Sequence, residues 1–393
     1  MRQITNDERR ARLAIRHHLS PTARVNDVAR LASDLVGLHG SDPATVFLSA
    51  AARMKQPARA VGSLERALYD DRTLVRTLCM RRTMFVVPLD LVPVVQAACT
   101  DALVPGERKR LVKLLETSGI TKRGARWLAE VEAKTLAELE TRGEATGAEL
   151  SRAVPGLAKQ VPYGEGKNWA GTMGMSTRVL FLLSSDQRVA RGRPKGSWTS
   201  SQYRWSPMAT WLPGGVPSMP ADDARNELVR RWLAAFGPGT TADVKWWTGW
   251  TAAKTKAALG AVGATEVALE EGTGWVLPDD EGLVRARKAW VALLPSLDPT
   301  TMGWQQRDWY LGDHGKAVFD TNGNAGPTVW VDGRIVGGWA QRRMGDVVYE
   351  LLEDVGWEAT AAITKTAGEL ENWLGDVRVT PRFPTPLQKT LSA

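Results

Sequence analysis

The sequence predicts an α+β protein assembled from several small units, each a group of helices followed by a β-hairpin. Helical and strand-like patterns follow one another along all 393 residues, a length that corresponds to two to four compact domains of ~100–200 residues. The composition, with 43% hydrophobic and 24% charged residues, is that of an ordinary globular protein. We therefore expect a folded chain of several units.

The N-terminal part of the sequence shows this order most clearly. The elements expected here are helices at 5–19, 22–35, 45–54 and 64–69, then β-runs at 74–80 and 83–87. Ser20-Pro21 ends the first helix, while Asp42 is a natural N-cap for the third, with Pro43 in its first turn. Helices followed by a β-hairpin are the order of elements in a winged helix.

The same order recurs along the rest of the chain. The further elements expected are a helical region at 89–142, a turn at 143–150, a helix at 169–183, a β-region at 188–205, a third unit from 221 whose helix carries Trp246, Trp247 and Trp250, and short β-runs at 266–269 and 274–276. Asp332-Gly333 is a strong hairpin signal between strands at 328–331 and 334–339, before a helix at 357–374 and a Pro-rich tail.

These elements divide into three winged-helix modules and a small C-terminal β-rich domain. The first module covers 1–115 and contains the candidate catalytic loop. The second module covers 116–215, the third covers 216–285, and the C-terminal domain covers 286–393.

Charge and motif content narrow the class of partner. The net charge of +8 and the pI of about 9.6 favour a polyanion, either nucleic acid or an acidic membrane surface. No run of ~18 apolar residues and no signal peptide is evident. Two cysteines and four scattered histidines do not suggest a disulfide framework or a metal site. The common nucleotide-binding and metalloprotease motifs are absent. We expect a cytoplasmic monomer that binds no metal, cofactor or membrane.

The loop at 38–43 is the main candidate for chemistry. His39, Ser41 and Asp42 place an imidazole, a hydroxyl and a carboxylate within four residues, between two helices. Such a loop can present His39 and Asp42 to a water molecule or to a cationic, sugar-like centre. The alternative is structural: Asp42 caps the next helix, Ser41 is a second capping candidate, and His39 packs or faces solvent.

Several basic residues are candidates for contact with nucleic-acid phosphates. They are Arg81, Arg82, Arg191, Arg193, Lys195, Arg342 and Arg343. Each of them also fits an ordinary solvated surface. The loop that contains Arg191, Arg193 and Lys195 is the best of these candidates, because a basic loop rich in Gly and Pro suits insertion beside a groove.

Five stretches, at 35–49, 74–88, 236–247, 294–299 and 331–339, together resemble the winged-helix DNA glycosylases of the AlkZ/YcaQ type. They occur in the family's order, so the resemblance covers nearly the whole chain. It implies tandem winged helices and a C-terminal β-domain that form a concave, basic surface. It also implies hydrolysis of the N-glycosidic bond of alkylated purines in damaged double-stranded DNA, in some members within interstrand crosslinks, with no metal or organic cofactor.

The sequence departs from the family at one position that matters. Characterised members carry Gln-x-Gln or Gln-x-Asp where this chain has His39-Gly40-Ser41, and here a carboxylate follows at Asp42. The roles implied are that His39 orients or deprotonates water, Asp42 stabilises developing positive charge, and Ser41 adds a hydrogen bond. An alkylated purine is already cationic, so its departure needs little acid catalysis. By the same resemblance, the neighbouring residues placed to contact phosphate are Arg81, Arg82 and Thr83.

Three hypotheses follow. The first is a monofunctional DNA glycosylase, which predicts that His39 and Asp42 line one pocket that opens onto a basic concave face. The second is a non-enzymatic winged-helix DNA-binding protein for damage recognition or regulation, with the same basic face but no water site near His39. The third is a protein-interaction module or another hydrolase that does not use DNA. Formation of abasic sites separates the first hypothesis from the others.

Overall fold

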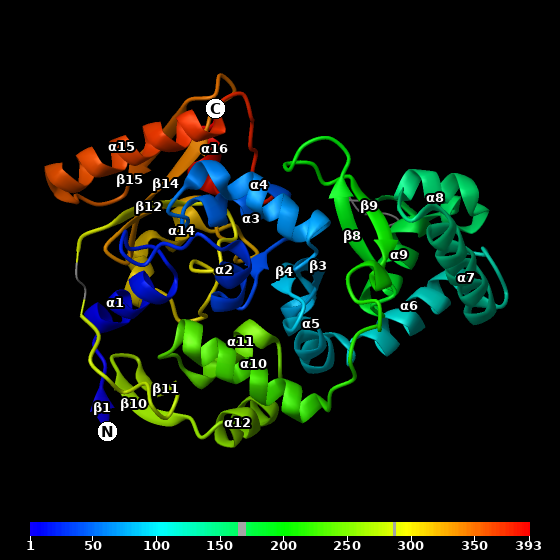
Figure 1. The fold of residues 1–393 in the computed structure, drawn as a ribbon, viewed down its shortest axis with the longest axis horizontal. Helices are drawn as coiled ribbons and strands as arrows, with labels where there is room; N and C mark the ends of the chain where they lie inside the picture. The colour runs from blue at the N-terminus through cyan, green and yellow to red at the C-terminus, as the bar shows by residue number, and fades with distance from the viewer. Residues whose placement is uncertain (164–169, 286–287) are drawn as a thin grey trace.

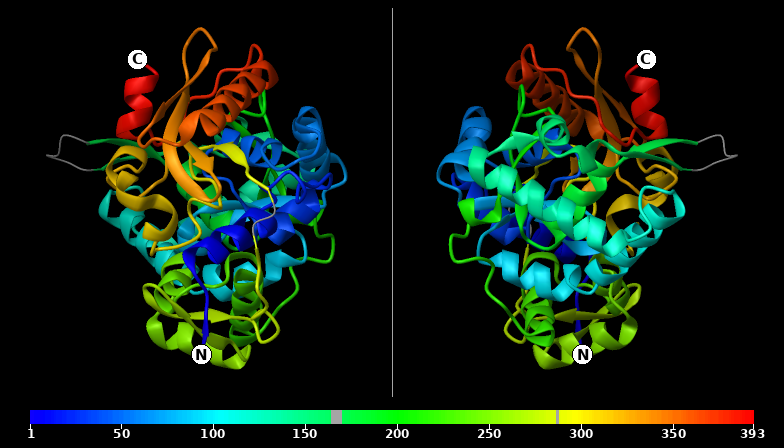
Figure 2. Two further views of the ribbon diagram at one scale, coloured as in Figure 1. Left: turned by 90° about the vertical axis from the view of Figure 1, so that its left-hand side faces the viewer. Right: turned by 90° about the vertical axis from the view of Figure 1, so that its right-hand side faces the viewer.

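The computed structural model describes residues 1–163, 170–285 and 288–393 and shows helices and small sheets mixed throughout (Figure 1). Figure 1 places the segment from α6 to β9 at one end of the molecule, α10–α12 below the middle, and β14, β15 and α15 above it. The N-terminus and the C-terminus lie at opposite ends, as all three views show (Figures 1 and 2). In the described parts of the chain, every helix is too short or too polar to cross a bilayer.

The first unit contains a three-stranded antiparallel sheet in the order β2-β4-β3. Its elements are α2 (Val28–Asp34), β2 (Leu38–His39), α3 (Pro43–Ala51), α4 (Ala60–Glu65), β3 (Leu74–Leu78) and β4 (Met84–Pro88). The predicted helices and β-runs are all present. The predicted loop at 38–43, however, begins with strand β2, so its candidate catalytic residue His39 is paired with Phe85 of β4.

The second unit has its own sheet, in the order β5-β9-β8. Its elements, after α5 (Leu91–Val95), are α6 (Val104–Thr117), α7 (Gly124–Arg142), β5 (Ala145–Thr146), α8 (Gly147–Ala153), α9 (Met175–Ser185), β8 (Val189–Pro194) and β9 (Tyr203–Pro207), with a separate hairpin of β6 (Gln160–Tyr163) and β7 (Gly171–Gly174). The helix predicted at 169–183 therefore starts later, after β7, and residue 169 itself lies outside the described residues.

The third unit takes one strand from the N-terminus of the chain. Its sheet has the order β1-β10-β11, in which β1 (Arg2–Gln3) runs parallel to β10 (Thr265–Leu269) and β11 (Gly272–Val276) closes the hairpin. The helices of this unit are α10 (Ala221–Phe236), α11 (Thr241–Thr248) and α12 (Ala252–Ala261). Local patterns did not predict β1, because two residues carry no periodicity and their partner lies far away in the sequence.

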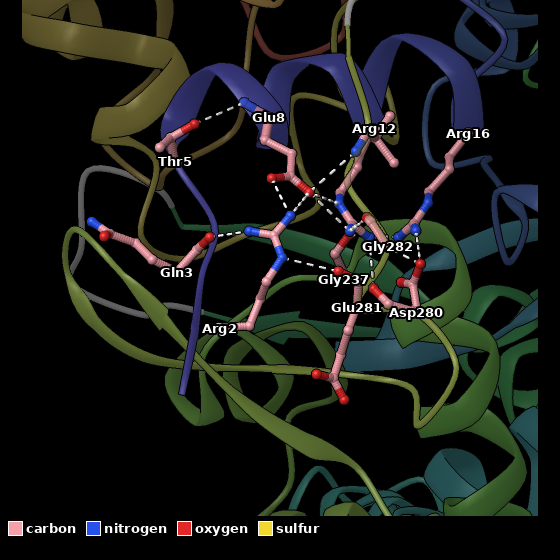
Figure 3. Close-up of polar contacts among 11 residues, drawn as sticks. Arg2, Gln3, Thr5, Glu8, Arg12, Arg16, Gly237, Asp280, Glu281 and Gly282 are labelled. Carbon is pink, nitrogen blue, oxygen red and sulfur yellow. Dashed lines mark hydrogen bonds and ion pairs between the residues drawn. The ribbon is translucent and has the colours of Figure 1, made fainter.

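Ion pairs fix α1 (Asn6–Arg16) against the third unit, as Figure 3 shows. Glu8 accepts hydrogen bonds from Arg2 at 2.6 Å and from Arg12 at 3.0 Å. Arg12 also donates to the Asp280 carboxylate at 2.9 Å, and Arg16 donates to the carbonyl oxygen of Gly237 at 2.6 Å. The N-terminal helix is therefore bound to two segments of the third unit.

The C-terminal part is built on an antiparallel sheet in the order β12-β13-β14-β15. Its elements are β12 (Val291–Leu294), α13 (Asp308–Leu311), α14 (Gly315–Val318), β13 (Thr328–Val331), β14 (Arg334–Gln341), β15 (Val347–Leu351), α15 (Gly356–Leu374) and α16 (Pro386–Leu391). The predicted turn at Asp332-Gly333 is confirmed, and both residues have the positive φ that a tight hairpin turn needs. The boundary predicted at 285/286 adjoins residues 286–287, which lie outside the described residues.

The hydrophobic cores explain why these units form one body. One cluster joins buried side chains of α1, α5, α10 and α11 to Trp330 of β13, and another joins α2 and α3 to β14 and α15. The second unit has a cluster of its own. Its β8–β9 hairpin nevertheless meets the first unit, where the Trp198 ring lies 5.1 Å from Phe47. A surface is thus formed where the second unit faces the first.

Candidate active site and nucleic-acid interface

The candidate catalytic loop is held at both ends by backbone structure. Leu38 and His39 pair with β4, and the Gly40 amide donates to the carbonyl oxygen of Met84 at 2.7 Å. Two residues later, α3 begins at Pro43 with Asp42 as its N-cap. His39 and Ser41 are therefore fixed relative to the sheet, unlike residues of a free loop.

Arg76 of β3 stabilises the same loop through a side-chain hydrogen bond. Its side chain is almost fully buried, and its Nη1 donates to the carbonyl oxygen of Gly40 at 2.7 Å. A Cβ at Gly40 would lie only 2.7 Å from that nitrogen, so a larger residue there would force the Arg76 guanidinium group to shift. The guanidinium group also stacks 4.9 Å from the ring of Tyr203 on β9. Arg76 thus connects the loop to the second unit.

His39 faces a cavity of about 270 Å³. The described residues that line it are His39, Ser41, Arg81, Thr83, Trp246, Leu297, Met302, Gln305, Arg307, Asn322, Gly323, Asn324 and Phe383. They come from the first unit, the third unit and the C-terminal part. Sequence reasoning had placed His39, Ser41, Arg81 and Thr83 near one another, and the structure brings these four together.

The imidazole of His39 is buried but lacks a complete set of partners. Only 3% of the residue is exposed, and its ring packs 4.9 Å from that of Phe85. Nδ1 is shielded from solvent and has no hydrogen-bond partner. Burial, with the positive charges of Arg81 and Arg76, lowers the pKa of His39 to about 3. The ring is therefore neutral at pH 7, able to hold a water molecule but too weak a base to deprotonate it.

The turn between β3 and β4 sends its two arginines in different directions. Arg81 and Arg82 both have positive φ, 51° and 61°. Arg81 lies over the indole of Trp246 at 3.9 Å and lines the cavity, where Gly249 leaves room for its side chain. Arg82 points to α6 and pairs with Glu107 at 2.5 Å. Of the pair, Arg81 belongs to the cavity and Arg82 does not line it.

Asp42 serves the fold and does not face His39. Its Oδ1 accepts a hydrogen bond from the Ala44 amide at 3.0 Å, and its Oδ2 accepts one from the Arg382 amide at 2.9 Å. It lines a separate, very small cavity beside Thr45 and Trp339. The expectation that His39 and Asp42 line one pocket is therefore wrong. Capping aims the carboxylate at the first amides of α3, away from the His39 cavity.

A wider cleft of about 550 Å³ adjoins the cavity at Ser41, which lines both. The other described residues lining the cleft are Pro43, Thr146, Gly147, Ala148, Glu149, Arg152, Arg191, Lys195, Ser201, Gln202, Tyr203, Trp205 and Arg382. Four of these are cations and one is an acid, whose carboxylate is occupied by the amide of Thr146 in the N-cap of α8. The cleft is therefore strongly positive, as a polyanion site requires.

The basic segment predicted as a loop is mostly strand β8, which contains Arg191 and Arg193, and its side chains divide between the cleft and the first unit. Arg191 lies 5.4 Å from the rings of Tyr203 and Trp205, and burial lowers its pKa to about 10. Lys195 is exposed at the rim. Arg193 turns away and pairs with Asp70 at 2.9 Å, which ties β8 to the first unit. The first two residues are in place to contact a ligand in the cleft.

Arg342 and Arg343 lie on the turn between β14 and β15 and line neither space. Arg342 donates to the carbonyl oxygen of Leu391 at 3.2 Å and sits 3.4 Å from Asp346. Sequence reasoning missed three arginines that matter more: Arg76, Arg307 and Arg382. None of them stands in a basic run of the sequence. Folding brings Arg307 into the cavity, Arg382 into the cleft and Arg76 against Gly40.

A second buried cluster supports the cavity wall. Arg53 and Asp298 form an ion pair at 2.6 Å with neither side chain exposed. Ser49 donates to Asp298 at 2.6 Å, and Thr300 accepts from Arg53 at 2.8 Å. This network fixes the segment that contains Leu297, a cavity residue held at φ 58°. It therefore positions one wall of the candidate site.

The cationic cleft adjoins the cavity of the buried, uncharged His39 imidazole at Ser41, and such a cleft attracts a polyanionic ligand. In the described parts of the chain, no three His, Cys, Asp or Glu side chains are grouped to hold a metal ion.

Comparison with known proteins identifies the family. Residues 32–373 match the family described as DNA glycosylase AlkZ-like. The chain belongs to that family, which confirms the resemblance seen in the sequence and places the protein among DNA repair glycosylases, with DNA as substrate. The structure matches the Streptomyces sahachiroi DNA glycosylase AlkZ with a TM-score of 0.73 and 21% identity, over 97% of this chain and 99% of that one. At this identity the match shows a shared fold. Curated protein sequences give no match.

Proposed function

We propose that this protein is a monofunctional glycosylase that removes alkylated purines, bulky adducts included, from damaged double-stranded DNA. The observation that carries the proposal is His39, a buried and neutral imidazole whose Nδ1 has no partner, in a cavity that adjoins a cationic cleft. DNA lies in the cleft, and the damaged nucleotide faces His39 near Ser41. The protein acts as a cytoplasmic monomer.

The topology supports three winged-helix modules, predicted at 1–115, 116–215 and 216–285, with a β-rich domain at 286–393. Because Leu111 and Leu115 of α6 pack in the core of the second unit, we place the first boundary before α6. Each of the first three units has a three-stranded sheet, and two of its strands form a hairpin after the helices. The second unit follows the order α7-β5-α8-α9-β8-β9, with the β6–β7 hairpin inserted between α8 and α9. In that unit the hairpin borders the cleft, which is where a wing is expected to contact DNA.

The chemistry asked of the protein is modest. An alkylated purine carries a positive charge and leaves as a neutral base, so the bond needs little help to break. His39 holds the attacking water on the side of its ring that lines the cavity, and Ser41 offers a second hydrogen bond at the mouth of the cavity. Asp42 has a structural role in this proposal, because both of its carboxylate oxygens are already used. The reaction uses only DNA and water.

We assign the contacts with DNA phosphates to basic and polar residues that line the cleft or the cavity. Arg191, Lys195 and Arg382 line the cleft, while Arg81 and Thr83 line the cavity. Arg82, Arg193 and Arg342 each have a carboxylate partner and are left as secondary contacts. Arg343, on its exposed turn, is also secondary.

The test is release of 7-methyl and 3-methyl purines from alkylated duplex DNA. We expect the wild type to form abasic sites and His39→Ala to lose about 10²-fold in rate while it still binds the duplex. His39→Gln restores the side chain typical of the family and should retain more activity than the alanine variant. Equal activity of wild type and His39→Ala would remove His39 from the mechanism.

The second candidate is a DNA-binding protein without glycosylase activity. It is favoured by the loss of both family glutamines at positions 39 and 41 and by the 3% exposure of His39. Under this alternative the wild type binds duplex DNA with steep salt dependence but releases no base from methylated or crosslinked substrates. That result would replace the first proposal.

A further inference from the structure

Two arginines in the His39 cavity share one aromatic platform. Arg81, from the turn between β3 and β4, lies 3.9 Å from the Trp246 ring centre, and Arg307, which precedes α13, lies 4.8 Å from it. Arg307 also packs 4.5 Å from Phe319. Both guanidinium groups line the cavity. Three elements remote in sequence thus place two cations at one spot.

No acidic side chain balances these charges within the cavity. The described residues that line it include arginines, amides and aromatic rings but no Asp or Glu. Arg81 Nε is buried without a hydrogen-bond partner, and Arg307 spends its Nε on the carbonyl oxygen of Trp304 at 2.8 Å. Burial and the charge of Arg307 lower the pKa of Arg81 to about 10. Two like charges held together in this way leave a strong attraction for an anion.

Amide groups complete the surroundings of an anion site. Asp320 accepts hydrogen bonds from the Asn322 and Asn324 amides, both at 2.8 Å. This turn sets both asparagines into the wall of the cavity. The Asn324 NH₂ group already donates to Asp320 Oδ2 at 2.8 Å, and its second N–H remains for an oxyanion beside the guanidinium groups.

The proposed reaction also needs a negative charge here. Loss of a purine leaves positive charge on the deoxyribose, and a cavity whose charged side chains are both arginines opposes this charge. Asp42 cannot relieve this repulsion, because it lies outside the cavity and caps α3. The missing charge has to enter with the substrate.

We propose that Arg81 and Arg307 together bind one phosphodiester of the DNA strand beside the damaged nucleotide. The inference rests on the proposed function. Bound there, the phosphate neutralises the arginine pair and sets a negative charge next to the sugar on which positive charge develops. Arg307, which no sequence motif marked, is thereby a DNA-binding residue of the site, and Trp246 positions it.

The test measures binding without chemistry. The probe is a labelled duplex with a tetrahydrofuran abasic-site analogue, in which single phosphates around the analogue are replaced in turn by neutral methylphosphonates. We expect one position to weaken wild-type binding about tenfold. The same replacement should cost Arg307→Gln or Arg81→Gln almost nothing, because the partner is already lost. The salt dependence of each variant should fall by about one phosphate contact.

Matched variants separate charge from folding. Arg307→Lys keeps the charge and should recover part of the affinity, whereas Arg126→Gln, which alters an exposed pair on α7, should match the wild type at every position. Thermal melting checks that each variant is folded. If every methylphosphonate costs Arg307→Gln as much as it costs the wild type, the phosphate site is refuted. Displacement of DNA by inorganic phosphate at matched ionic strength, from the wild type but not from Arg307→Gln, would assign the site to free phosphate instead.

The two proposals fail in different ways. A wild type that shows the coupled phosphate but releases no base refutes the glycosylase proposal alone. A wild type that releases base but shows no coupled position refutes the arginine pair alone.

Discussion

Two buried histidines of this protein differ in one respect that separates core from site. His17 and His39 are both almost completely buried, and burial lowers the pKa of each to about 3. His17 has a partner for each ring nitrogen, Thr300 Oγ1 at 2.8 Å and the carbonyl oxygen of Ala235 at 3.2 Å. His39 leaves Nδ1 unpartnered beside a cavity. A lowered pKa alone does not mark a site, whereas an imidazole that lines a cavity and leaves a ring nitrogen without a partner does.

The charges around the two histidines differ in the same way. Near His17, Arg53 and Asp298 neutralise each other within hydrogen-bonding distance. Near His39, Arg81 and Arg307 have no carboxylate beside them among the residues that line the cavity. Around His17, the protein itself supplies every hydrogen-bond partner and balances the charges. Around His39, a ligand is needed to do so.

The largest expected effect is a loss of stability when the buried Arg53–Asp298 ion pair near His17 is broken. Asp298→Ala leaves Arg53 as a buried charge without its partner, which should cost about 3–5 kcal/mol of unfolding free energy. Urea unfolding measures the loss. Glu130→Ala breaks an exposed pair on α7 and should leave stability unchanged. A loss below ~1 kcal/mol for Asp298→Ala would mean that water or a new partner enters the network.

His17 and His39 should contribute equally to the loss of stability at acidic pH. In the unfolded chain an imidazole takes up a proton below pH ~6.5, but in the folded protein His17 and His39 stay neutral down to about pH 3. Stability is therefore fully present above pH ~6.5 and falls as the pH drops toward 3, by about 1.4 kcal/mol per pH unit for each histidine.

Glutamine variants isolate these two contributions. His17→Gln and His39→Gln should each flatten the decline in stability between pH ~7 and pH ~5 by the share of one histidine, as measured by urea unfolding. A normal decline in His39→Gln alone would show that His39 protonates in the folded protein and that solvent reaches its ring.

The smallest expected effect is that of substitutions at Asp42, the N-cap of α3. Asp42→Ala removes the cap of α3 and should cost about 1 kcal/mol, while Asp42→Asn keeps an acceptor for the Ala44 amide and should cost less. Base release per folded molecule should stay close to that of the wild type in both variants. If Asp42→Asn lost as much base-release activity as His39→Ala, the Asp42 carboxylate would have a catalytic role.

Local signals in the sequence predicted much of the fold. Periodicity and caps gave most helices, and Asp332-Gly333 gave its hairpin, because these depend on neighbouring residues. The strand β1 and the long-range pairing of Arg2 with Val267 could not be predicted in this way. The candidate site shows the same division. His39 and Arg81 stood in recognisable stretches, but Arg307 joined them only through folding.

The pairing of β1 with β10 has a consequence for synthesis of the chain. Arg2 precedes the first and second units in the chain, whereas its partner Val267 is added only after both of these units have been synthesised. The edge of the third sheet thus joins the two ends of a very long loop, which carries a closure cost that grows only slowly with length. We expect the second unit, which has its own core, to fold on the ribosome while the N-terminal strand still waits for its neighbour.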